Sequence, residues 1–589
     1  MLLPKMKALN TSRDMVDAFG GYNHNLRIGA GEFYDMKNLT SSHYPVLSSR
    51  PNRGSYAMPT TQNGAVGLIA KDALCYVEGG DFIINGTHVS MELSNEPKTL
   101  ISMGAYVIIM PDKKWINTTP TDGLKAFEHG NIEARVTTQS EVTFELCTID
   151  GSNLEVTKSN SEPENPTSMA YWLDTSSTPH TLKQYSATST MWVSVATTYI
   201  KISCNDASIF DAFEVNDGVT IKDIESTKLS DINEKSTLIW AKGENYIVIT
   251  GIIDEVITQE TPITIERRMP NMDFIIESEN RLWGCRYGTA LNGEVVNEIY
   301  ASKLGDFKNW NCFAGISTDS YAASVGTDGQ FTGAITHLGY PLFFKENCVH
   351  KVYGNYPANY QIQTTTCRGV QKGCSKSLAI VNEVLYYKSR SAVCAYDGSL
   401  PIDISSALGD VAYSDAVAGS LGNKYYISMA DTAKTYHLFV YDTLRGMWHK
   451  EDNLKARDFC TCRGDLYYID DSLGTVKSIL GLNEKDKEAT AIEWMAETGL
   501  IGTDSPDRKY ISRMDVRISM PVGSRVHIYV QYDSSGIWEH LHTMVATSLR
   551  TFAIPVRPRR CDHLRLRIEG YGEAKIFSIS KTITEGSDI

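Results

Sequence analysis

Residues 424–449 read KYYISMADTAKTYHLFVYDTLRGMWH, and the pattern in this stretch decides the fold. An aromatic and aliphatic strand is followed by a polar turn, and a second strand then leads to Gly446 and Trp448. Small sheets of this kind, stacked in a circle, would cover each other's apolar faces and leave only short edges, so a repeat of the pattern predicts a β-propeller. A set of unrelated β-sandwiches with the same turn chemistry is the alternative. The pattern recurs in about seven irregular units: residues 73–89, 105–117, 280–313, 340–354, 383–400, 424–449 and 465–479.

Tight turns typical of β-hairpins are frequent. Both residues of an Asn-Gly or Asp-Gly pair tolerate positive φ, which makes such a pair the strongest local sign of a hairpin. Long stretches with the helical spacing of apolar residues are hard to find. We therefore predict an all-β chain. The pairs begin at Asn63, Asn85, Asp122, Asp150, Asp217, Asn292, Asp328 and Asp397.

The composition is that of a large folded protein. The chain has 589 residues, of which 42% are hydrophobic and 21% are charged, and this is too apolar for intrinsic disorder. At roughly 150 residues per domain, the length predicts about four domains. The net charge is −14, and the whole excess lies in residues 1–482, because basic and acidic residues are equal in number from 483 onward. This change of charge places a domain boundary at residues 483–488.

The chain divides into five segments. Residues 131–265 are rich in Thr and Ser and too long for a loop, so we expect a small β-sandwich or barrel inserted into the propeller. Residues 483–589 contain alternating runs and are expected to form a C-terminal β-sandwich, with Trp538 in its core. The propeller then consists of residues 51–130 and 266–482. The remaining segment, residues 1–50, is expected to be an extended arm or a closing strand.

Motifs of the common enzyme classes are missing from the sequence. There is no P-loop, no H-E-x-x-H zinc motif, no G-x-S-x-G elbow and no EF-hand loop. The N-terminus lacks the apolar segment of a secretory signal, and the 12 cysteines are scattered rather than spaced as a disulfide framework. We therefore expect a non-enzymatic protein with no catalytic residue, no cofactor, no metal and no membrane segment, made in a reducing cytoplasm.

Three local clusters have the residue types of a site, and each has a plainer explanation. His540-Leu-His542 places two imidazoles on one strand face, but no third metal ligand lies nearby in the sequence, so we favour a surface pair. Cys460-Thr-Cys462 is explained by buried small residues at least as well as by redox chemistry. Asp470-Asp471 could bind Ca²⁺, but the sequence Asp-Asp-Ser-Leu-Gly is also an ordinary turn, which we favour.

A carbohydrate function is the main alternative to a structural role. Propellers host sialidases and other glycosidases, which need paired carboxylates or an arginine cluster at one mouth. Residues 441–448 loosely resemble the Asp-box of such enzymes, in which Asp and Trp lock a turn, but the motif occurs once in that form. A lectin-like C-terminal domain, with Trp538 or Tyr571 stacking on a sugar, is a second form of this alternative.

The densest positive patch lies near the C-terminus. A nucleic-acid site would need such charge on a net-basic domain with interleaved aromatic residues. Acidic residues lie among these arginines, so we predict a network of salt bridges at a protein interface. The patch consists of Arg557, Arg559, Arg560, Arg565 and Arg567.

Three segments resemble tail structural proteins of bacteriophages. In their order along the chain they look like the podovirus-type tail nozzle family, with the second similar to blades found in phages of Gram-positive bacteria. The first segment contains Phe19-Gly-Gly21, Gly31-Glu-Phe-Tyr-Asp35-Met-Lys-Asn38 and Val46-Leu-Ser-Ser-Arg50-Pro51. The second contains Thr264-Ile-Glu-Arg-Arg268, Met272-Asp-Phe274 and Asn280-Arg-Leu-Trp-Gly284, and the third is Pro555–Gly572 followed by Gly586-Ser-Asp588.

The resemblance implies a propeller subunit that forms a ring, hexameric in known examples, around the DNA exit channel of a phage tail. Its partners would be other copies of the chain and adjacent tail or adaptor proteins. It would reside in the virion after assembly in the host cytoplasm. A nozzle, a neighbouring hub and a minor tail protein with a receptor-facing domain all stay open.

An acidic propeller suits such a conduit. Its wall would repel phosphate, so that DNA passes during ejection without sticking, whereas a basic bore would hold it. We place Arg50 and Pro51 where the N-terminal strand enters the propeller. Trp283, Trp310 and Trp448 are predicted to lie in blade cores or blade turns.

Overall fold

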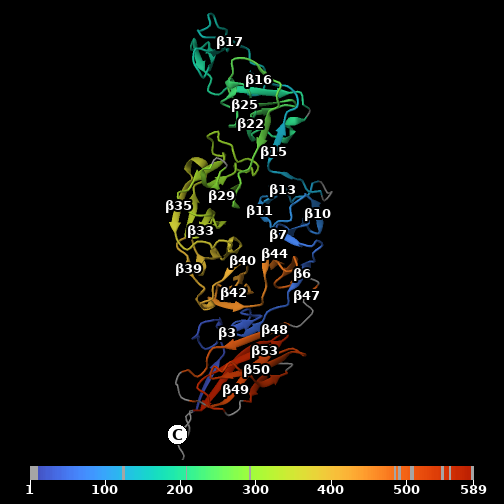
Figure 1. The fold of residues 1–589 in the computed structure, drawn as a ribbon, viewed down its shortest axis with the longest axis vertical. Helices are drawn as coiled ribbons and strands as arrows, with labels where there is room; N and C mark the ends of the chain where they lie inside the picture. The colour runs from blue at the N-terminus through green and yellow to red at the C-terminus, as the bar shows by residue number, and fades with distance from the viewer. Residues whose placement is uncertain are drawn as a thin grey trace, which may run out of the picture.

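The regular secondary structure of the chain is almost entirely β-strand, with a few short 3₁₀ turns between strands. The computed structural model describes residues 11–121, 126–206, 208–290, 293–482, 486–487, 492–503, 508, 510–545, 550–555 and 559–584. Figure 1 shows a long molecule, with an inserted domain at one end, a ring of small sheets in the middle and a β-sandwich at the other end. The predicted all-β propeller with an inserted β domain and a C-terminal sandwich is confirmed. Over the described ranges, no helix has the length and apolar character needed to cross a membrane.

Seven blades form the propeller: blades 1 to 5 are separate four-stranded antiparallel meanders, blade 6 is part of a larger sheet, and blade 7 is completed by strands from outside its meander. Blade 1 contains β7 (Ala65–Ala70), β8 (Leu74–Glu78), β9 (Asp81–Ile84) and β10 (Thr87–Ser90), and blade 2 contains β11 (Thr99–Met103), β12 (Tyr106–Met110), β13 (Lys114–Asn117) and β14 (His129–Asn131). Blade 3 contains β28 (Phe274–Ser278), β29 (Arg281–Thr289), β30 (Val295–Ala301) and β31 (Tyr321–Ser324), and blade 4 contains β32 (Gly333–His337), β33 (Tyr340–Lys345), β34 (Cys348–Tyr353) and β35 (Gln361–Thr366).

The last three blades follow in the same order along the chain. Blade 5 contains β36 (Ala379–Val381), β37 (Val384–Lys388), β38 (Val393–Tyr396) and β39 (Ile402–Asp403). Blade 6 contains β40 (Ser414–Leu421), β41 (Lys424–Ala430), β42 (Tyr436–Asp442) and β43 (Met447–Lys450). Blade 7 contains β44 (Ala456–Cys462), β45 (Asp465–Asp470), β46 (Thr475–Ser478) and β6 (Gly54–Ala57), with β47 (Asp486–Lys487) also paired to β6.

Each of the seven sequence units supplies the two middle strands of one blade. Residues 340–354, for example, contain β33 and β34, which pair with Phe344 opposite Val349. Neighbouring blades share apolar cores, such as the one that joins Val77 of blade 1 to Val107 of blade 2. The circular stacking that was expected from covered sheet faces is therefore what holds the blades together.

The ring is closed between blade 7 and blade 1. Leu68 and Leu74 of blade 1 pack with Tyr467 and Ile469 of blade 7 in one core. The outer strand of blade 7 is β6, which comes from the N-terminal part of the chain and pairs antiparallel with β46. Because blade 1 follows β6 directly in the sequence, this pairing ties the beginning of the propeller to its end.

Residues 11–50, predicted as an extended arm or a closing strand of the propeller, form strands of the terminal sandwich and of the sheet that continues blade 6. The side chains of Phe33, Met36 and Leu39 are buried in the core that this segment shares with the sandwich and blade 6. Burial of these apolar side chains favours the packed arrangement. In the sandwich, β1 (Thr11–Val16) and β5 (Leu47–Ser49) pair with β54 (Lys575–Thr584), and β4 (Leu39–Thr40) pairs with β5. In the second sheet, β3 (Glu32–Lys37) pairs with β48 (Glu493–Thr498). The link to blade 6 is β2 (Gly21–Tyr22), which pairs with β43.

The terminal sandwich therefore combines both ends of the chain. One sheet has the order β4-β5-β54-β49-β52, and the other runs β2-β3-β48-β53-β50-β51 and is continuous with blade 6. The buried tryptophan of this domain is Trp494. The predicted core residue Trp538 is only half-buried, with the Arg567 guanidinium 4.1 Å from its ring centre. The remaining strands are β49 (Tyr510–Ser519), β50 (Arg525–Tyr532), β51 (Glu539–Met544), β52 (Arg550–Ile554) and β53 (Leu564–Tyr571).

The inserted domain lies between blades 2 and 3. Two of its sheets share a core that includes Phe144, Phe210 and Ile247, and a third sheet forms the outer tip (Figure 1). The first sheet contains β15 (Ala134–Thr137), β27 (Thr264–Arg267), β22 (Gly218–Lys222) and β23 (Ser236–Leu238). The second contains β24 (Ala241–Lys242), β25 (Tyr246–Thr250), β21 (Tyr199–Cys204), β16 (Val142–Cys147) and β26 (Ile257–Gln259). The tip contains β17 (Val156–Ser159), β18 (Tyr171–Asp174), β19 (Thr181–Ser186) and β20 (Met191–Ser194).

Candidate functional site

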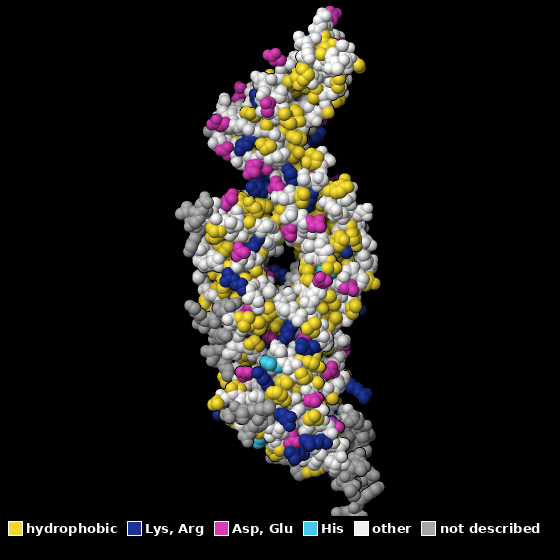
Figure 2. Space-filling view, turned by 180° about the vertical axis from the view of Figure 1, so that it is seen from behind, with side chains coloured by type: hydrophobic (Ala, Val, Ile, Leu, Met, Phe, Trp, Pro, Cys, Tyr) yellow, Lys and Arg dark blue, Asp and Glu magenta, His cyan; other side chains and the backbone are white. Residues whose placement is uncertain are grey.

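The first strands of the seven blades surround a central channel. A cavity of about 540 Å³ lies there, and Figure 2 shows the opening in the middle of the ring. Leu68, Leu100, Ile275 and Phe459 line it, each from a different blade. This volume is typical of a site for a small molecule.

The charged residues that line the channel balance one another. They are Lys98, Lys376, Asp273 and Asp458. Lys376 and Asp458 form an ion pair between blades 5 and 7, with an N–O distance of 3.0 Å. The cavity of a single chain is therefore lined by two lysines and two aspartates, and the acidic wall of a DNA conduit stays a prediction.

Lys98 and Asp112 form a buried ion pair beside the channel, with an N–O distance of 2.6 Å. Lys98 Nζ also donates a hydrogen bond to Ser94 Oγ at 2.5 Å, and the Ser94 backbone N–H donates to Asp112 Oδ1 at 2.7 Å. Burial alone would raise the pKa of Asp112, but these hydrogen bonds and the ammonium charge hold that pKa below its usual value. The carboxylate therefore stays ionised and fastens the start of blade 2.

Arg50 and Pro51 lie between β5 of the sandwich and β6 of blade 7, where the N-terminal segment passes into the propeller. Arg50 is buried, and its Nε donates to Asn38 Oδ1 at 2.8 Å while its Nη1 donates to Pro51 O at 2.9 Å. Its Nη2 lies 3.5 Å from Asp452 Oδ2. One guanidinium thus connects the sandwich, the passage to blade 7 and the end of blade 6.

A second buried arginine, Arg53, completes this junction. Its Nη2 lies 3.1 Å from Glu451 Oε2, and its Nη1 lies 2.6 Å from Asp452 Oδ2. The sequence carries a signal for it, because the basic residues of Arg50-Pro-Asn-Arg53 and the acidic pair Glu451-Asp452 each follow a strand. A single sequence does not show which charges meet across 400 residues of chain, so the pairing was missed.

The three tryptophans predicted to lie in blades are all buried. Trp283 belongs to β29 of blade 3. Trp310 follows β30, and its Nε1–H donates to Phe307 O at 3.0 Å. Trp448 belongs to β43 of blade 6, and its Nε1–H donates to Ile404 O at 2.7 Å.

Part of the predicted arginine interface is used inside the sandwich. Arg565 and Arg567 of β53 both reach Glu497 of β48, with N–O distances of 3.1 and 2.8 Å. Glu497 is only 6% exposed, so the two guanidinium groups neutralise a buried carboxylate. Arg557 lies outside the described residues.

Arg559 and Arg560 lie on the surface of the sandwich. Arg559 forms an ion pair with Glu539 at 2.6 Å, and its guanidinium lies 4.7 Å from the ring centre of Tyr532. Among the described residues, Arg560 has no ion-pair partner closer than 4 Å. These two side chains are therefore the part of the patch that another protein could contact.

The three clusters with the residue types of a site have local partners. His540 is exposed and hydrogen-bonded to a threonine, and burial raises the pKa of Cys460 to about 12, which keeps its thiol protonated and unreactive. Asp470 accepts hydrogen bonds from Ser472 and binds a lysine, and Asp471 binds Arg457. Within the described ranges, no three His, Cys, Asp or Glu residues are grouped so that they could hold a metal ion.

Comparisons with known proteins give weak structural likenesses. No protein-family model matches the chain, and no curated protein matches it. An exo-β-1,3-galactanase from Phanerochaete chrysosporium is 9% identical, with 52% of this chain and 94% of that chain covered and a TM-score of 0.21. Trypanosoma rangeli sialidase is 8% identical, with 90% of this chain and 96% of that chain covered and a TM-score of 0.21. AztD from Citrobacter koseri is 7% identical, with 86% of this chain and 99% of that chain covered and a TM-score of 0.27. Likenesses at this level carry no argument about activity or substrate.

Proposed function

We propose that the chain is a non-catalytic structural protein of a bacteriophage tail, a subunit of the nozzle ring or of a neighbouring hub. Copies of the chain, six by the resemblance, would surround a common bore, and DNA would pass through this bore between copies during ejection. Adjacent tail or adaptor proteins would be the other partners. The protein would act in the virion, after assembly in the host cytoplasm.

The positions of the three segments that resemble tail proteins support this proposal most strongly. Residues 19–51 contain β2 to β5 and link the sandwich to blades 6 and 7. Residues 264–284 leave the inserted domain along β27 and enter blade 3 through β28. The described part of residues 555–572 contains β53, whose sheet is continuous with blade 6. The three similar segments thus lie where the domains connect, and proteins with the same domain arrangement would need similar sequences at these connections.

The long shape of the molecule suits a subunit that lies between other rings. The inserted domain and the sandwich lie at opposite ends of the propeller (Figure 1). A closed ring of such subunits would present inserted domains to one neighbour and sandwiches to the other. The acidic excess of residues 1–482 would repel phosphate in a bore formed between copies.

Light scattering on the full chain after size-exclusion chromatography tests ring formation. The proposal predicts a particle whose mass is a multiple of 65.4 kDa, with six copies expected, and ring-shaped particles in electron micrographs of the same fraction. A chain that stays monomeric, even with the other tail proteins of its phage present, would contradict the proposal.

A receptor-binding or glycan-processing tail protein is the second candidate. The aromatic pocket between blades 3 and 4, described below, favours the receptor-binding form. A polysaccharide-hydrolysis assay separates the candidates, because a structural subunit releases no reducing ends. Clear turnover would favour the glycan-processing form and contradict a non-catalytic role.

A further inference from the structure

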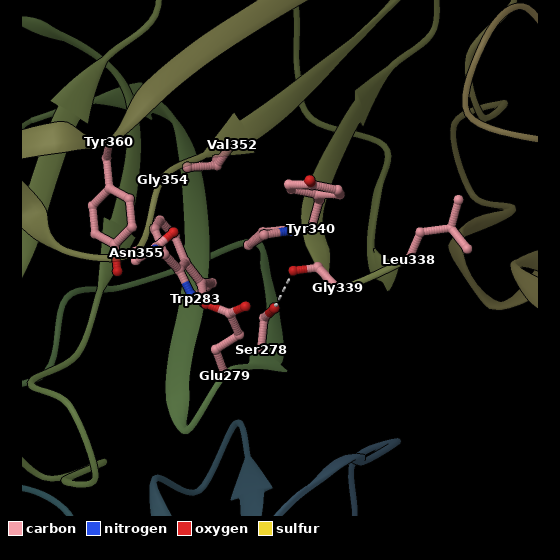
Figure 3. A pocket seen from close by; sticks show the side chains of 11 residues that line it. Ser278, Glu279, Trp283, Leu338, Gly339, Tyr340, Val352, Gly354, Asn355 and Tyr360 are labelled. Atoms are coloured by element: carbon pink, nitrogen blue, oxygen red, sulfur yellow. Dashed lines mark hydrogen bonds between the residues drawn. The ribbon is translucent and has the colours of Figure 1, made fainter.

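A small pocket lies between the turn tips of blades 3 and 4, away from the central channel. Its cavity volume is about 170 Å³, below the roughly 300 Å³ at which pockets for drug-sized ligands begin. Figure 3 shows Trp283, Tyr360, Asn355 and Glu279 gathered at one side of the cavity and Tyr340 at another. The space and its lining suit a single small ring.

Several polar groups of the pocket have no hydrogen bond inside the protein. Trp283 is only 3% exposed, yet, unlike those of Trp310 and Trp448, its indole N–H has no acceptor among the described residues. The Glu279 carboxylate and the Asn355 side-chain amide likewise form no hydrogen bond or ion pair within the described part of the chain. The Trp283 N–H keeps contact with solvent, as do the exposed Glu279 and Asn355 side chains, so all three are free to exchange water for the polar groups of a ligand.

Backbone geometry holds two of these groups at the pocket. Glu279 and Asn280 form the two-residue turn between β28 and β29, both with positive φ (50° and 57°). Such a turn matches the twist of the strands it joins and projects its side chains from a fixed position. On the blade 4 side, Gly354 has φ 115°, and a Cβ there would lie 2.6 Å from Asn359 O, so only glycine lets the chain bring Asn355 to the rim.

Charges of both signs lie around the pocket. Lys351 Nζ lies 4.2 Å from the ring centre of Tyr340, and the Arg281 guanidinium lies 6.0 Å from that of Tyr360, so cations already occupy both tyrosine rings. A cationic ligand would meet these two cations as well as Glu279, and an anionic ligand would meet Glu279 as well as the two cations, so the mixed charges favour neither sign. A neutral ligand with several hydroxyl groups meets neither penalty.

We propose that this pocket binds one neutral sugar ring, such as an exposed residue of a glycan. The Trp283 N–H would donate to a sugar oxygen, the Glu279 carboxylate would accept from sugar hydroxyls, and Asn355 would do both. The Tyr340 ring, which is 36% exposed, would cover the apolar face of the sugar. The pocket lies within one chain, so sugar binding can be tested independently of ring assembly.

Saturation-transfer NMR on the full chain tests the proposal with a panel of neutral methyl hexosides and methyl N-acetylhexosaminides, together with choline and inorganic phosphate. We expect transfer to at least one neutral glycoside and none to choline or phosphate. Glu279→Ala and Tyr340→Ala should each weaken that glycoside about tenfold, as expected for one hydrogen bond to a charged group or one stacking ring. Trp283→Phe, which keeps a ring but removes the N–H, should weaken it about fivefold.

Glu383→Ala is the matched control. Glu383 lies in the equivalent turn of blade 5, after Asn382, and both residues have positive φ, but it does not line the pocket. This variant should bind the glycoside as the unmodified chain does, and all variants should melt cooperatively. Transfer to no neutral glycoside, transfer to choline or phosphate alone, or binding that survives both Glu279→Ala and Tyr340→Ala would overturn the proposal.

Discussion

Tyr22 lies opposite Trp448 in an antiparallel pair between β2 and β43, and this pair makes blade 6 and the terminal sandwich one continuous sheet. Both side chains are buried, and the Tyr22 ring lies 5.6 Å from that of Phe439 in the core of blade 6. The sandwich is thus attached to the propeller by a backbone ladder and a shared core, whereas a flexible linker would leave it independent.

Gly21→Ala should weaken this attachment. Gly21 has φ 83°, and a Cβ there would overlap the carbonyl oxygen of Trp448. The left-handed backbone costs an alanine about 1–2 kcal/mol, and the overlap should add about 1–3 kcal/mol. Gly86→Ala is the control, because Gly86 has φ 75° with nothing near its Cβ position. Equal melting temperatures for the two variants would mean that the β2–β43 pair does not carry the attachment.

Arg53→Met tests the junction that closes the ring. Removing Arg53 leaves the buried Glu451 carboxylate without its ion-pair partner and Asp452 with Arg50 alone, and should lower the free energy of unfolding by about 3–5 kcal/mol. Lys37→Met removes an exposed pair with Glu493 and should cost less than about 1 kcal/mol. Urea unfolding of both variants measures the difference. Similar losses in the two variants would show that the buried network is not needed for closure.

The stability of the propeller should fall below neutral pH because of His449. Burial, and then the neighbouring Lys424 charge, lower the pKa of this histidine from 6.5 to about 3. The unfolded chain therefore binds a proton below pH 6.5 that the folded chain does not bind, so the contribution is complete above pH 6.5 and is lost on acidification. Each pH unit below 6.5 corresponds to about 1.4 kcal/mol. Between pH 7 and pH 5 the free energy of unfolding of the unmodified chain should therefore fall by about 2 kcal/mol more than that of the His449→Gln variant. Parallel urea titrations of the two proteins check this, and equal losses would contradict it.

Two variants of the arginine patch should affect different properties, one the assembly of the protein and the other its stability. Arg560→Glu changes an exposed side chain and should alter the melting temperature very little, but it should weaken binding between subunits or to a neighbouring tail protein if this surface is an interface. Arg567→Glu should instead lower the melting temperature, because it places a second negative charge beside buried Glu497. Light scattering and thermal melting of both variants measure the two effects. Unchanged assembly in Arg560→Glu would remove this surface from the interface.

The repeat was visible in the sequence because the middle strands of each blade are apolar and joined by tight turns. Residues 465–479, for example, carry buried Leu466 to Ile469 and then the Asp470 turn. The first and last strands of a blade are less distinctive, since the outer strands β31 and β35 alternate with exposed positions and the inner strand β40 contains a bulge. Local pattern therefore indicated the number of blades but not all of their strands.

The long-range strand pairing of the N-terminal segment could not be predicted from local sequence patterns. β1 pairs with β54, and Arg53 meets Glu451, across most of the chain, and a single sequence carries no record of such pairings. Trp538 shows a different limit. An aromatic residue near a strand suggests a core position, yet a nearby arginine, here Arg567, provides an equally good apolar and cationic contact at the surface.

The most direct test of the proposed function is to locate the protein in phage particles. A peptide tag inserted at the exposed Glu162 turn of the inserted domain and labelled with gold antibody would mark the chain in electron micrographs. A nozzle or hub subunit should be labelled on a ring at the tail of the particle, with several copies per particle. Particles that contain no tagged protein, or that carry it only on the capsid, would contradict the account.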